Sequence, residues 1–172
     1  MSSRNNKLEQ SDNQVSQRNN NAPSRNKIKD DDLLFTAVFF PELAPNIIRN
    51  LNISDDDLSL LRKSIADKKT SPEEIQVMLE ILGFQISLDA ITHILSHHNA
   101  KFQVLERIIA LNPDFLKGHE KLVLELAKHG FAVPFDKIQL VLNSKQLDEE
   151  TKIKSISRTI NIFPNAIRNI PK

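Results

Sequence analysis

The sequence predicts an all-α fold, and two observations lead to that prediction. From Ser54 onward apolar residues recur at helical spacing, and no run shows the clean two-residue alternation of a strand. Residues 83–95 and 130–142 also share one pattern, Gly-Phe-x-(Ile/Val)-x-(Leu/Phe)-Asp-x-Ile-x-x-(Ile/Val)-Leu, at a constant offset of 47 residues. Duplicated units of this length are typical of stacked helices, which usually build binding surfaces.

The first elements are predicted from acidic residues and prolines. Asp30-Asp31-Asp32 precedes an apolar run at 33–40, and carboxylates suit the positive end of a helix dipole. Pro41 and Pro45 interrupt that run, and a short helix is expected over 46–51. The folded domain is therefore expected to begin near residue 30.

Two capping signals predict the next two helices. Ser54 with Asp57 resembles a capping box and predicts a helix to about residue 67, with Leu58, Leu61 and Ile65 on one face. Ser71 followed by Pro72 predicts a second start, and Gly83 is expected to end that helix. This second helix carries Ile75, Met78, Leu79 and Leu82 on one face and Val77 and Ile81 on another, so we expect it to be packed on two sides.

Further helices are expected over 87–98, 100–111, 118–129, 134–143 and 148–163, with a last turn over 165–170. Pro113 and Pro164 stop the third helix of each repeat, so the two three-helix units span 71–113 and 118–164. Ile91 and Ile138 are predicted to be equivalent core positions. In the helix over 148–163, Ile153, Ile156 and Ile160 are expected to point inward.

In size and pattern these three-helix units resemble the armadillo class of α-helical repeats. The resemblance covers residues 71–163 and is architectural. It implies a short superhelix, and a compact helical bundle that contains one duplication is the alternative. In either case residues 30–172 form a single all-α domain.

Residues 1–29 form a polar, Asn-rich tail. Seven of these residues are Asn, and only Leu8, Val15 and Ile28 are large aliphatics besides Met1. Such a segment buries too little apolar surface to offset the entropy of ordering, so we expect it to be disordered.

The composition excludes several classes of site. The chain has no Cys and only three Gly, and it contains no Gly-rich phosphate loop and no Gly-x-Ser-x-Gly elbow. Its longest apolar run, 33–40, is too short to span a bilayer, and no signal peptide is recognised. We therefore expect a non-enzymatic protein without a cofactor, located in a cytoplasm, its own or that of a host.

Two clusters contain residue types that can bind a metal. His93 and His97 lie four residues apart on one predicted helix, with His98 next to the second, but the Glu of a catalytic zinc motif is replaced by Ile94. Asp55-Asp56-Asp57 lacks the glycine and the later Glu of a calcium loop. Both clusters are interpreted as structural, and no metal is expected.

The charge is distributed unevenly along the chain. The net charge is +4 over residues 1–29, −8 over 30–150 and +5 over 151–172. Lys152, Lys154 and Arg158 lie in the last long helix, and Arg168 and Lys172 follow it. Lys154 and Arg158 are predicted to share the face opposite the isoleucines. They favour docking of a protein with an acidic surface, and the alternative is binding of nucleic-acid phosphates by these residues and the basic tail.

The predicted function is therefore a protein–protein interaction module: an adaptor, a regulator or a microbial effector. Lys152, Lys154 and Arg158 are its predicted partner-binding residues. An oligomeric state is not predicted from the sequence.

Overall fold

The computed structural model describes residues 27–165, and within that range the protein is all-helical, with 73% of the residues in helices and no strand. The all-α prediction is confirmed. The described α-helices are α2 (Asp30–Phe39), α3 (Ala44–Leu51), α4 (Asp55–Ala66), α5 (Pro72–Ile81), α6 (Leu88–Ser96), α7 (Ala100–Leu111), α8 (Glu120–Lys128), α9 (Ile138–Asn143) and α10 (Glu149–Ile162). Most of the predicted disordered tail lies outside the described residues, as do positions 166–170 of the expected turn, Arg168 and Lys172.

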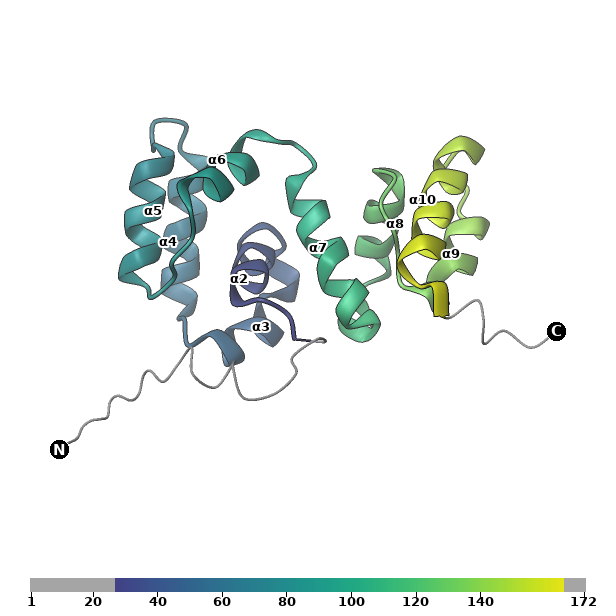
Figure 1. Ribbon diagram of the computed structural model, residues 1–172, viewed down its shortest axis with the longest axis horizontal. Helices are drawn as coiled ribbons and strands as arrows, with labels where there is room; N and C mark the ends of the chain where they lie inside the picture. Colours follow the sequence, from purple (N-terminus) through teal and green to yellow (C-terminus); the bar gives the residue numbers. More distant parts are fainter. Residues whose placement is uncertain (1–26, 166–172) are drawn as a thin grey trace.

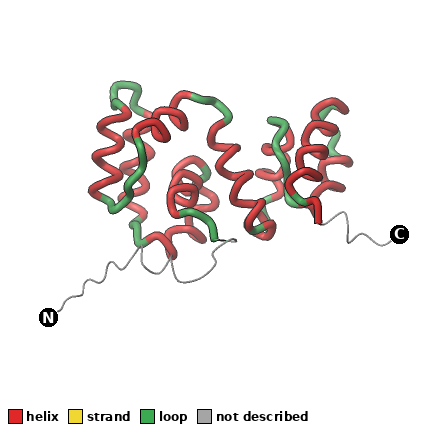
Figure 2. The backbone as a smooth tube through the Cα atoms, in the orientation of Figure 1, coloured by secondary structure: helices red, strands yellow, loops and turns green. Residues whose placement is uncertain are grey.

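The helices are arranged in an elongated row, with loops between them and no strand in the described part (Figures 1 and 2). Helices α4 and α5 lie at one end, and α9 and α10 lie at the other, beyond α7 and α8 (Figure 1). One hydrophobic core runs through the row and includes Leu34 of α2, Leu61 of α4 and Leu105 of α7. This arrangement fits either a short superhelix or a bundle.

Three of the predicted helix starts, at Ser54, Ser71 and Asp148, have side chains that satisfy the first backbone N–H groups. Ser54 with Asp57, and Ser71 with Glu74, form complete capping boxes. Asp148 caps α10 by accepting a hydrogen bond of 2.8 Å from the Thr151 backbone N–H. The sequence therefore predicts these boundaries well, because the capping group lies within three residues of the N–H that it binds.

The two copies of the duplicated segment end their first helix in the same way. Gly83 and Gly130 both have positive φ, at 96° and 81°. The next residue donates its backbone N–H to a carbonyl five residues back, Phe84 to Leu79 at 2.8 Å and Phe131 to Leu126 at 2.9 Å. A left-handed residue with this hydrogen bond is the usual helix end that glycine permits.

After this turn the copies diverge. Ser87 caps α6 with its hydroxyl, whereas the matching position in the second copy is Pro134, which has no hydroxyl. There the chain forms a 3-10 turn before α9, which is shorter than the predicted helix over 134–143. Ile91 is fully buried and Ile138 only partly so, which contradicts their predicted equivalence.

Helix α5 is packed on one side and not on two. Ile75 and Leu79 are buried against the core, while Val77 and Ile81 are 53% and 79% exposed. The prediction of two-sided packing is wrong because the described neighbours, α4 and α6, meet α5 through the face of Ile75 and Leu79. The opposite face of α5 is in water.

Candidate functional site

The predicted partner-binding residues all lie on α10, and the protein itself already binds two of them. The Lys152 ammonium donates to the Leu142 carbonyl oxygen at 2.9 Å and pairs with Glu149 at 3.4 Å. Its side chain is mostly buried. Lys152 therefore joins the end of α9 to α10 and has little charge to offer a partner.

Arg158 is the cation of an internal ion pair. Its guanidinium donates two hydrogen bonds to the carboxylate of Glu106, a buried residue of α7, and lies 5.3 Å from the centre of the Phe131 ring. Glu106 also accepts a hydrogen bond of 2.7 Å from the Ala132 backbone N–H. The hydrogen bonds that Arg158 donates to Glu106 raise the pKa of Arg158. This bidentate pair ties α7, the loop after α8 and α10 together.

Lys154 is exposed, as is about half of the Arg158 side chain. Its methylene groups pass close to Gly130, since a Cβ built on that glycine would lie 3.0 Å from the Lys154 side chain. The ammonium forms no ion pair with a carboxylate in the described part of the chain. Lys154 and the half-exposed Arg158 thus give one side of α10 a positive rim.

The orientation of α10 differs from the prediction. Ile153 and Ile160 were expected to point inward but are 63% and 37% exposed, and only Ile156 is partly buried. The inward positions are Ser155 and Thr159, which are fully buried.

The two hydroxyls bind the loop that follows α8. Ser155 donates to the Phe131 carbonyl oxygen at 2.8 Å, and Thr159 accepts from the Val133 backbone N–H at 2.9 Å. A loop buried against a helix must have its backbone groups paired, which explains why small hydroxyl residues occupy this face.

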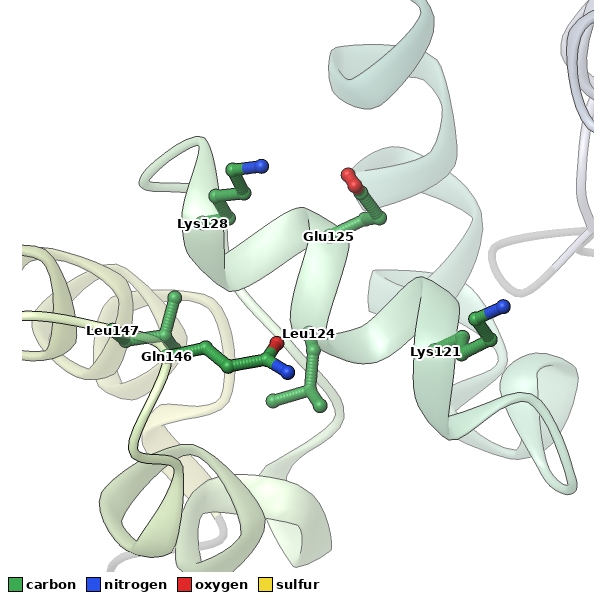
Figure 3. A pocket seen from close by; sticks show the side chains of 6 residues that line it. All are labelled: Lys121, Leu124, Glu125, Lys128, Gln146 and Leu147. Carbon is green, nitrogen blue, oxygen red and sulfur yellow. The ribbon is translucent and has the colours of Figure 1, made fainter.

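A shallow hollow of about 460 Å³ lies between α8 and the loop that leads to α10 (Figure 3). Leu124 and Gln146 point toward each other, and the charged ends of Lys121, Glu125 and Lys128 point away from them (Figure 3). Its lining combines two leucines, one glutamine, one carboxylate and two ammonium groups.

A smaller cavity of about 190 Å³ lies between α2, α6 and α7. Asp32 and Arg107 line it and form a bidentate pair, with atoms 2.9 and 3.2 Å apart. Burial, followed by the Asp32 and Asp30 carboxylates, raises the pKa of Asp31 in the same wall. The ion pair joins α2 to α7, and the remaining lining is largely apolar.

Histidines gather on and beside α6. The rings of His93 and His97 are 4.1 Å apart, and His129 stacks on Phe102 at 4.3 Å. Among the described residues no group of three or more His, Asp or Glu side chains is arranged to hold a metal ion.

Comparison with models of protein families gives no match, and neither curated proteins nor solved structures give one. Within residues 27–165 no helix has the length and apolar character needed to cross a membrane.

Proposed function

We propose that the chain is a non-enzymatic protein-interaction module, acting as an adaptor, a regulator or a microbial effector. One observation carries the proposal: six large apolar side chains stay exposed on described helices. They fall into two groups, Leu60, Val77 and Ile81 on α4 and α5, and Leu142, Ile153 and Ile160 on α9 and α10. Burying such a side chain is worth about 1.5–3 kcal/mol, which favours a protein partner that covers it.

The α10 face suits a partner that is apolar in its centre and acidic at its edge. Ile153 and Ile160 supply apolar contact area, and Lys154 with the half-exposed Arg158 supplies positive charge on the other flank of the exposed side of α10. Opposite charges around an apolar patch guide docking and select the partner.

Nucleic acid is the weaker candidate. Lys152 and Arg158, two of the cations that favoured it, already bind Leu142, Glu149 and Glu106. Contact with several phosphates needs several accessible cations, and α10 offers Lys154 with part of Arg158.

We also propose that units 71–113 and 118–164 are copies of one helical repeat that works in a cytoplasm, its own or that of a host. The matched helix ends at Gly83 and Gly130 support the duplication. The absence of Cys suits a reducing compartment.

Affinity capture with the full chain as bait tests the proposed function. Ile153→Glu should lose proteins that the wild type retains, because it removes apolar area and adds a negative charge beside Lys154. Asn50→Glu, at an exposed position on α3, is the matched control and should retain them. Identical captured sets for all three baits would overturn the proposal, and partners that disappear after nuclease treatment would favour nucleic acid.

A further inference from the structure

We draw no further inference here: the strongest candidate, the cavity between α2, α6 and α7, is lined by the carboxylates of Asp31 and Asp32 and equally by the cations of Lys29 and Arg107, so that its charge selects no ligand, and no second feature of the described residues points to one.

Discussion

The ion pair between Glu106 and Arg158 allows a quantitative test of how the C-terminal helices are held. Arg158→Ala removes the cation and leaves a carboxylate that is buried in α7, with the Ala132 backbone N–H as its remaining hydrogen-bond donor. Glu106→Gln keeps a side-chain oxygen that can accept from Ala132, and it leaves the guanidinium half in water. The two substitutions break one pair but leave very different groups unpaired.

The expected losses of stability follow from that difference. Removing one partner of a buried pair costs about 3–5 kcal/mol when the other charge stays buried, as it does in Arg158→Ala. Glu106→Gln should cost about 1–2 kcal/mol of stability, because the hydrogen bonds at this side chain lose the strength that the negative charge gives them but are still partly formed. For a chain of this size each kcal/mol lowers the melting temperature by about 2–4 °C.

Urea denaturation followed by circular dichroism measures both losses. Lys145→Ala, which removes an exposed cation, is the control and should change stability by less than about 0.5 kcal/mol. If Arg158→Ala behaves like the control, or if Glu106→Gln costs more than Arg158→Ala, then the buried carboxylate is not what the arginine stabilises. A joint charge reversal of Lys154 and Arg158 would therefore be a poor probe of partner binding, because it places a second carboxylate against Glu106.

Three further predictions concern the rest of the molecule. Burial and the neighbouring carboxylates raise the pKa of Asp31 above 3.8, so Asp31 stabilises the fold in acid, and this stabilisation is lost as the pH rises through the raised pKa. Asp31→Asn should therefore have a higher melting temperature than the wild type at pH 7, and the difference should vanish at about pH 3. Ile91→Ala should cost about 3–4 kcal/mol and Ile138→Ala about 1–2 kcal/mol in urea denaturation, since only Ile91 is fully buried, and equal losses would contradict this packing. Chelators should leave the melting temperature unchanged, and a shift of several degrees with zinc that His93→Ala abolishes would show that the histidines bind metal.

The features that the sequence predicts well depend on residues close together in the chain. Ser71 and Glu74 satisfy each other's backbone N–H groups within one turn, and Gly83 and Gly130 end helices through their own φ angles. The start of α9 was predicted less well because Pro134 replaces the capping hydroxyl of Ser87, although the surrounding pattern is shared. The shared sequence pattern of the two copies therefore produces the same helix end at Gly83 and Gly130, but different helix starts at Ser87 and Pro134.

Helix α10 shows why the candidate site could not be predicted in the same way. A hydrophobic pattern identifies the buried face of a helix only when the helix packs on apolar side chains. Helix α10 instead covers the loop after α8, whose backbone groups need hydroxyl partners, and Ser155 and Thr159 therefore turn inward. That rotation places Arg158 beside the buried Glu106 and brings Ile153 to the surface. Ile153 is thus exposed because α10 turns Ser155 and Thr159 toward the backbone groups of the loop. A docked apolar partner would bury the Ile153 side chain that this orientation leaves in water.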